Sequence, residues 1–213
     1  MIHPVTRVAL VLAIAGLSLL ALRFYRRQNG KSVKGGAISP PKMAWLFFTV
    51  YLWFLVCPLA AMDPSVPSGA RWVLGAFALS MWIRGLAELH MLYVTHSWRP
   101  PYGVAHDVFC IALVVAGLLF VPGAWAGFTT PRTSWVSALW LLVLFSLCVE
   151  TVYATLFFRA VKGKTIGEDG VWFAAENEAR FRRINRLTFA LNIPQYAVLF
   201  GLVGTAAIGL EGT

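Results

Sequence analysis

Charged side chains are scarce in this chain, since only 13% of its 213 residues are Asp, Glu, Lys or Arg, against ~25% in average soluble domains. Hydrophobic residues make up 59%, and the mean hydropathy is +0.71. This composition excludes an ordinary soluble globular domain and predicts an all-α, polytopic bundle of membrane helices. The sequence contains no internal repeat, so we expect residues 1–213 to form a single transmembrane domain.

Cysteine and histidine are also few, with three and four residues. Cys57, Cys110 and Cys148 lie within or at the start of apolar runs and form no C-x-x-C pair, so we expect buried, small hydrophobic side chains. No lipobox-like cysteine or A-x-A site follows the first apolar run, and we expect no cleavage there. No motif identifies a cofactor.

The net charge of +9 does not indicate a nucleic-acid partner, because the basic residues fall in short loops between apolar runs. Fourteen of the 18 Lys and Arg residues lie in segments 23–42, 96–107 and 159–186, while the opposite side has only Arg7, Arg71 and Arg132. The positive-inside rule therefore predicts a multi-pass protein of the cell inner membrane with both termini on the non-cytoplasmic side.

Six apolar runs approach the ~20 residues that a helix needs to cross a bilayer. They cover residues 8–22, 43–62, 72–95, 108–124, 134–158 and 187–208. Six spans are therefore predicted, with five as the alternative. Residues 159–186 are predicted to be a cytoplasmic segment with a short interfacial helix after Gly170, because acidic and basic side chains alternate there at i,i+4 spacing.

Ionisable residues inside the third and fifth runs indicate the functional site. Arg84, Glu88 and His90 lie in the third run and Glu150 in the fifth, where a charge costs at least ~2.5 kcal/mol unless it faces the bundle interior or a cavity. The fifth run has no basic residue, so Glu150 needs Arg84 or His90 from another helix, or must keep its proton. The alternative is a neutral Glu150 that joins helices by hydrogen bonds.

Helical geometry separates these residues into two faces, since successive residues advance by 100°. Arg84 and Glu88 share a face, whereas His90 lies 200° from Glu88, so the Glu-x-His spacing is not a metal motif. A structural ion pair between Arg84 and Glu88 is an alternative to a catalytic role. We predict Glu150, Glu88, Arg84 and His90 as catalytic residues, with proton transfer through the two carboxyls.

Other polar residues lie at depths similar to these and are predicted to bind substrate. Asn192 and Gln195 flank Pro194 in the sixth run, and Tyr93 and Tyr153 lie near the carboxyls in the third and fifth. Arg183 and Arg186 have no i,i+4 acidic partner before the sixth run and are predicted to bind a phosphate or an anionic headgroup, or simply to anchor the loop.

A second cluster surrounds the Pro100-Pro101 turn. His96 and His106 could approach each other as metal ligands with Asp107 as a third donor. The favoured interpretation is structural: Asp107 caps the helix that starts at residue 108. The sequence leaves metal binding at this turn undecided.

The predicted function is a small integral membrane enzyme that exchanges protons with a hydrophobic lipid or isoprenoid-like substrate, as an isomerase or cyclase does. Membrane lipid and a hydrophobic small molecule are its expected partners. One alternative is a non-enzymatic carrier or a subunit of a larger membrane complex, and another is a metal- or haem-binding redox protein.

Overall fold

The computed structural model describes residues 3–30, 40–95, 97, 100–125, 128, 134–161 and 179–208, and each regular element within these ranges is helical. The elements are α1 (Pro4–Gly30), α2 (Pro40–Thr49), η1 (Val50–Val56), α3 (Cys57–Met62), α4 (Ser68–Tyr93), α5 (Pro100–Phe120), α7 (Ser134–Val161) and α8 (Ala179–Ile208). The all-helical prediction is confirmed over these ranges.

Five stretches within the described ranges are long and apolar enough to cross a membrane, which indicates a membrane protein. They are Pro4–Arg27, Met43–Met62, Ser68–Met91, Pro101–Phe120 and Trp135–Phe157. The sixth predicted span, residues 187–208, lies within α8 and is not among these five, so the count of six stays a prediction. Residues 162–178, where the interfacial helix was expected, lie outside the described ranges, and Ala179 already begins α8.

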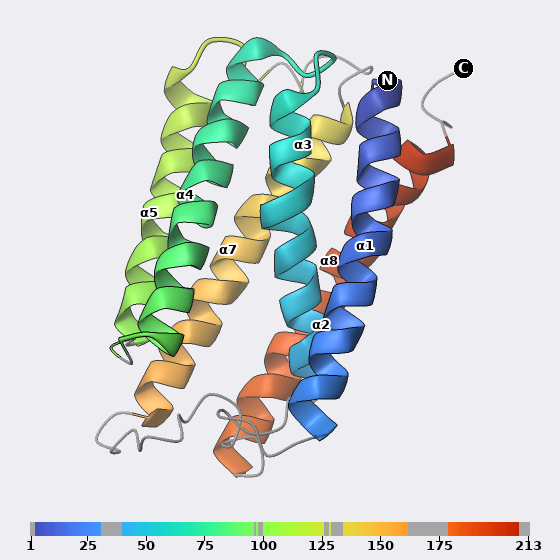
Figure 1. Ribbon diagram of the computed structural model, residues 1–213. Helices are drawn as coiled ribbons and strands as arrows, with labels where there is room; N and C mark the ends of the chain where they lie inside the picture. The colour runs from blue at the N-terminus through green and yellow to red at the C-terminus, as the bar shows by residue number, and fades with distance from the viewer. Residues whose placement is uncertain are drawn as a thin grey trace.

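The helices form one bundle in which α4 and α5 run side by side and α7 crosses behind them (Figure 1). On its other side α7 packs against α8, while α3 packs against α4 and α2 against α8. Large side chains fill the centre: Phe77 of α4, Val114 of α5 and Trp140 of α7 are fully buried. Each lies on a stripe of apolar residues at helical spacing, which explains why these three helices face one another.

The second span is a continuous rod of α2, η1 and α3, and its middle part is a π-helix (Figure 1). The amide of Cys57 bonds the carbonyl of Leu52, five residues back, and Pro58 has no amide hydrogen to offer the turn before it. Wide turns of this kind often lie beside functional sites. Here Val50, Trp53, Phe54 and Leu55 of the π-helix line a cavity of about 880 Å³, described below.

Helix α5 begins eight residues earlier than predicted, at Pro100 instead of residue 108. Proline fits the first turn of a helix, where its missing amide hydrogen has no partner to lose. The prediction that Asp107 caps this helix is therefore wrong, because Asp107 lies in its second turn, where it is fully buried. The early start brings His106 and Asp107 onto the same helix as Cys110.

Asp63 joins the start of α1 to the turn between α3 and α4. The Ser65 amide donates to Oδ1 of Asp63 at 2.7 Å, and the His3 amide donates to Oδ2 at 2.9 Å. One carboxylate thus satisfies two backbone donors from segments about 60 residues apart in sequence. This turn closes the end of the bundle where α4 starts.

Candidate functional site

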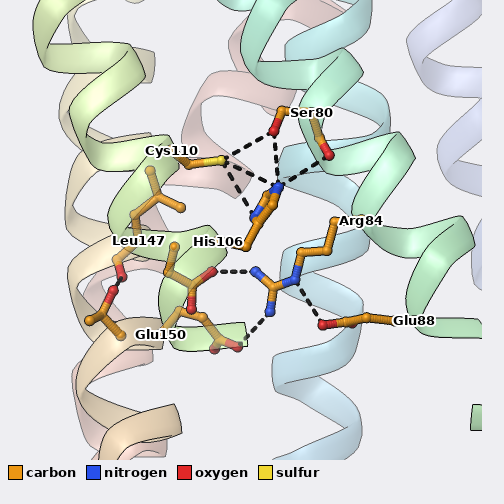
Figure 2. Close-up of polar contacts among 9 residues, drawn as sticks. Ser80, Arg84, Glu88, His106, Cys110, Leu147 and Glu150 are labelled. Carbon is orange, nitrogen blue, oxygen red and sulfur yellow. Dashed lines mark hydrogen bonds and ion pairs between the residues drawn. The ribbon is translucent and has the colours of Figure 1, made fainter. Parts of the chain in front are cut away.

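The guanidinium of Arg84 lies among three carboxyl groups from three helices. Its Nε donates to Glu88 Oε1 of the same helix at 3.0 Å, and its Nη1 donates to Asp107 Oδ1 of α5. Its Nη2 lies 3.9 Å from Glu150 Oε1 of α7. Figure 2 shows the guanidinium between Glu88 and Glu150. We call Arg84, Glu88, Asp107 and Glu150 the Arg84 cluster.

These four residues come together because they lie on the buried faces of their helices. On α4, Phe77, Met81, Arg84 and Glu88 follow one another at spacings of four, three and four residues, so the charged pair continues the buried face of the helix. Gly103 of α5 leaves room for the guanidinium, because a Cβ atom there would lie 3.2 Å from Arg84 Nη2. Helix packing therefore dictates where the charge lies.

The cluster holds more acid than base. Three carboxylates against one guanidinium give a formal charge of −2 if all are ionised. Asp107 and Glu150 are buried, with side-chain exposures of 0% and 7%, whereas Glu88 reaches 26%. Asp107 Oδ2 and Glu150 Oε2 have no hydrogen-bond partner among the described residues. Uncompensated buried charge costs several kcal/mol, on the order of 3–5, so the cluster favours holding a proton or binding a cation.

A cavity of about 880 Å³ opens beside the cluster, and Arg84, Glu88 and Glu150 form its polar wall. The other lining residues come from α1, α2, η1, α4, α5 and α7 and are mainly apolar. Leu20 of α1 and Leu86 and Leu89 of α4 line the cavity and are exposed. The cavity wall therefore includes exposed apolar side chains of α1 and α4, which suits entry of a ligand from a bilayer.

Aromatic rings make up much of the apolar wall. Trp45 and Tyr153 pack with ring centroids 5.4 Å apart, and Tyr153 stacks on Phe157 at 6.1 Å. Across the cavity, Phe54 of η1 meets Trp82 of α4 edge-on at 5.6 Å. These rings surround the space that a ligand next to Glu150 would occupy.

A second polar group lies one turn away, on the side of α4 that faces α5. Ser80 Oγ lies 2.9 Å from His106 Nε2, and Cys110 Sγ lies 3.6 Å from both Ser80 Oγ and His106 Nδ1 (Figure 2). Ser80 and His106 line a smaller cavity of about 510 Å³, whose wall also includes Arg84 and Glu88. The Arg84 cluster is therefore reached from two cavities.

The structure brings together only part of the predicted site. Arg84, Glu88 and Glu150 converge as the sequence predicts, and Tyr153 lines the cavity with them. His90 is exposed on α4 and is not among the lining residues of either cavity. The side chain of Tyr93 lies outside the described part of the structure. The catalytic role of the converging residues stays a prediction.

The predicted substrate-binding residues of α8 lie elsewhere. Gln195 Nε2 donates to Asn192 Oδ1 at 2.7 Å, and both residues are buried without lining either cavity. Arg183 and Arg186 are exposed in the first turns of α8. Asn192 and Gln195 thus form a separate polar pair on one face of α8, in which Asn192 Nδ2 and Gln195 Oε1 have no hydrogen-bond partner among the described residues.

The sequence interpretation missed Asp107 as a member of the cluster and overlooked Ser80 and Cys110. A signal was present: Gly103, Asp107, Cys110 and Val114 follow a four, three, four spacing, which is the buried stripe of a helix that starts at Pro100. Assigning residues 100–107 to a loop concealed that stripe.

Metal binding at the Pro100-Pro101 turn gains no support. Among the described residues, no group of three or more His, Cys, Asp or Glu side chains has an arrangement that could hold a metal ion. Asp107 is engaged by Arg84, and His106 turns towards Ser80. His96 lies outside the described ranges.

Comparison with known proteins does not assign this site, because no protein-family model, curated protein or solved structure matches the chain. The function must therefore be argued from the Arg84 cluster and its cavities.

Proposed function

We propose that the protein is a small integral membrane enzyme that carries out acid–base chemistry on a hydrophobic, lipid or isoprenoid-like substrate in the 880 Å³ cavity. Glu150 is the acid that exchanges a proton with the substrate, and Arg84 stabilises the carboxylate that remains. An isomerisation, in which a proton is added at one carbon and removed from another, suits two carboxyls on one wall.

The observation that carries this proposal is the environment of Glu150. Its side chain lines the cavity, is 7% exposed, and keeps Oε2 without a hydrogen-bond partner among the described residues. Glu150 Oε2 is therefore available to a ligand, since a buried polar atom without a partner favours binding one. Glu88, more exposed and on the same wall, is placed to take up or return the second proton.

We further propose that the protein is a multi-pass protein of the cell inner membrane with both termini on the non-cytoplasmic side. Helix α1 begins, and α8 ends, at the same end of the bundle (Figure 1), and Arg27 and Arg159 lie in the last turns of α1 and α7 at the opposite end. This distribution supports a basic, cytoplasmic end. On this topology the Arg84 cluster lies in the cytoplasmic half of the membrane.

The proposal is tested by proton exchange into lipid. Purified protein in nanodiscs is incubated in heavy water with a lipid extract of the membrane from which it was purified, and deuterium incorporation is measured by mass spectrometry. The wild type is expected to label a hydrophobic compound, and Glu150→Gln to abolish labelling while the protein stays folded.

Thr151→Val is the matched control, because the Thr151 hydroxyl only donates to the Leu147 carbonyl of its own helix at 2.8 Å. This variant is expected to label lipid as the wild type does. Undiminished labelling by Glu150→Gln would overturn the proposal. Loss of the folded protein in Glu150→Gln would instead support a structural role for Glu150 between the helices.

A proton-coupled carrier is the second candidate, and the two cavities favour it. Arg84 and Glu88 line both the 880 Å³ and the 510 Å³ cavity. Carriers need an ionisable group that is reached from two sides. Uptake of a compound into vesicles without chemical change to that compound would favour the carrier over the enzyme.

A further inference from the structure

The chemistry of the large cavity specifies the charge of its ligand. The charged groups that face Glu150 are Arg84 and Glu88 of α4 and Asp107 of α5. With Glu150 itself, these groups sum to a formal charge of −2. An anionic ligand would add to this surplus, whereas a cation would reduce it.

Outside α4, α5 and α7, no described element supplies a compensating charge. Within α5, the titratable His106 interacts with Arg84 and Glu88, but its ring bonds Ser80 in the smaller cavity and does not line the large one. The parts of α1, α2 and η1 that line the cavity contribute only uncharged residues. Helix α8, which packs against α7, contributes the uncharged Asn192 and Gln195 to the buried interior. The balance around Glu150 must therefore come from a proton or from a bound cation.

The apolar wall fits a cation as well. Trp45, Trp53, Phe54, Trp82, Tyr153 and Phe157 line the cavity. Aromatic faces attract cations, and more strongly when water is excluded. Glu150 provides the second requirement, a buried carboxyl with one oxygen lacking a partner among the described residues.

We propose that the large cavity binds amphiphiles that carry a positive charge on an apolar body, and that each bound cation displaces one proton from the Arg84 cluster. The inference rests on the proposed function, of which it names the ligand class: a lipophilic ammonium or a substrate that becomes cationic during the reaction. The charge balances in both cases: a lipophilic ammonium enters as one proton leaves the cluster for water, and a substrate that becomes cationic takes that proton from the cluster itself. Entry occurs between α1 and α4, where Leu20, Leu86 and Leu89 are exposed.

The test uses two probes of the same shape and opposite charge, tetraphenylphosphonium and tetraphenylborate. Binding to the full-length protein in nanodiscs of zwitterionic lipid is measured by titration calorimetry, with empty nanodiscs as the background. The wild type is expected to bind the phosphonium and not the borate. Repeating the titration in two buffers of different ionisation enthalpy is expected to show close to one proton released per cation.

Glu150→Gln is expected to weaken phosphonium binding about 10- to 100-fold and to abolish proton release, as loss of a charged, desolvated contact does. Glu88→Gln provides a second variant should Glu150→Gln fail to fold, because Glu88 is partly exposed and Glu88→Gln removes a carboxylate from the same wall. Thr151→Val is the control and is expected to bind as the wild type does.

Equal binding of both probes, or phosphonium binding that neither Gln variant weakens, would overturn the inference. Phosphonium binding without proton release would overturn its exchange step. Failure of the proposed enzyme gives a different result, because cation binding with proton release would then persist although no deuterium enters lipid. Conversely, deuterium labelling without phosphonium binding would support the proposed enzyme activity and overturn the inference that the ligand is cationic.

Discussion

The α4–α5–α7 bundle has two different halves: apolar side chains fill one half, and charged side chains border a cavity in the other. In the half where α4 starts, which we call the packed half, Phe77, Val114 and Trp140 are fully buried in the apolar core. In the other, polar half, the same stripes carry Arg84, Asp107 and Glu150 and border a cavity of about 880 Å³.

Two glycines on the same face of α5 show how the halves differ. A Cβ at Gly117 would lie 2.5 Å from Val73 Cγ1, so this glycine lets α4 and α5 close tightly in the packed half. A Cβ at Gly103 would meet only Arg84 Nη2, at 3.2 Å. Glycine therefore brings backbones together at one end and makes room for a charge at the other.

The largest predicted loss of stability comes from a substitution in the polar half. Arg84→Met leaves three carboxyls without a cation and should reduce the free energy of unfolding by ~3–5 kcal/mol, the usual cost of breaking a buried ion pair. Chemical denaturation in mixed micelles measures it. Arg159→Met, which removes an exposed arginine at the end of α7, is the control and should change stability by less than ~0.5 kcal/mol.

Adding Asp107→Asn to Arg84→Met should restore part of the lost stability, because one surplus acid is removed together with the base. If Arg84→Met were as stable as the wild type, the Arg84 cluster would not be charged as described. In that case the polar half would differ from the packed half in shape alone.

The next largest effect is a difference in stability between alanine substitutions at Gly117 and at Gly103. Gly117→Ala should destabilise the protein by ~1–3 kcal/mol, because the stiff, branched Val73 cannot move away. Gly103→Ala should cost less than ~1 kcal/mol, since it displaces the end of a flexible side chain. Thermal unfolding in detergent compares them. Equal losses, or a larger loss at Gly103, would contradict the distinction between the halves.

The smallest effect concerns the turn that closes the packed half. Burial raises the pKa of Asp63, but hydrogen bonds from Ser65 and from the His3 amide outweigh it, so the pKa lies below its ordinary value. Asp63 therefore stabilises the fold above its unfolded pKa of about 3.9, and this stabilisation is lost as the pH falls through the lowered pKa.

Asp63→Asn should accordingly lower the Tm at neutral pH by ~2–4 °C, the equivalent of about 1 kcal/mol. The difference should disappear in acid, below the folded-state pKa of Asp63. Thermal scans of both proteins over a pH series measure it. A difference that persists in acid would show that the carboxylate is not the stabilising group.

Much of the fold and part of the site could be predicted from the sequence. The scarcity of charge predicted membrane helices, and helical spacing placed Arg84 and Glu88 on one face. Because the helix of Glu150 has no basic residue, the sequence predicted that Glu150 approaches Arg84 or His90 or keeps its proton, and the structure brings it near Arg84.

The rest depended on features that periodicity does not reveal. The Pro100-Pro101 pair suggested a turn, yet proline is equally suited to the first turn of a helix, so Asp107 was assigned to a helix cap. Depth along the membrane grouped Asn192 and Gln195 with the carboxyls, but depth does not say which neighbour a helix faces. Asn192 and Gln195 lie on α8, which packs against α7 and contributes no residue to the wall of either cavity.

The central claim is that the Arg84 cluster holds an exchangeable proton next to the cavity. Difference infrared spectroscopy of the protein in nanodiscs at neutral pH tests it through the stretching band of a protonated carboxyl. We expect such a band in the wild type, and we expect it to be lost in Glu150→Gln and on addition of tetraphenylphosphonium. A wild type without the band, or a band that both changes leave intact, would contradict it.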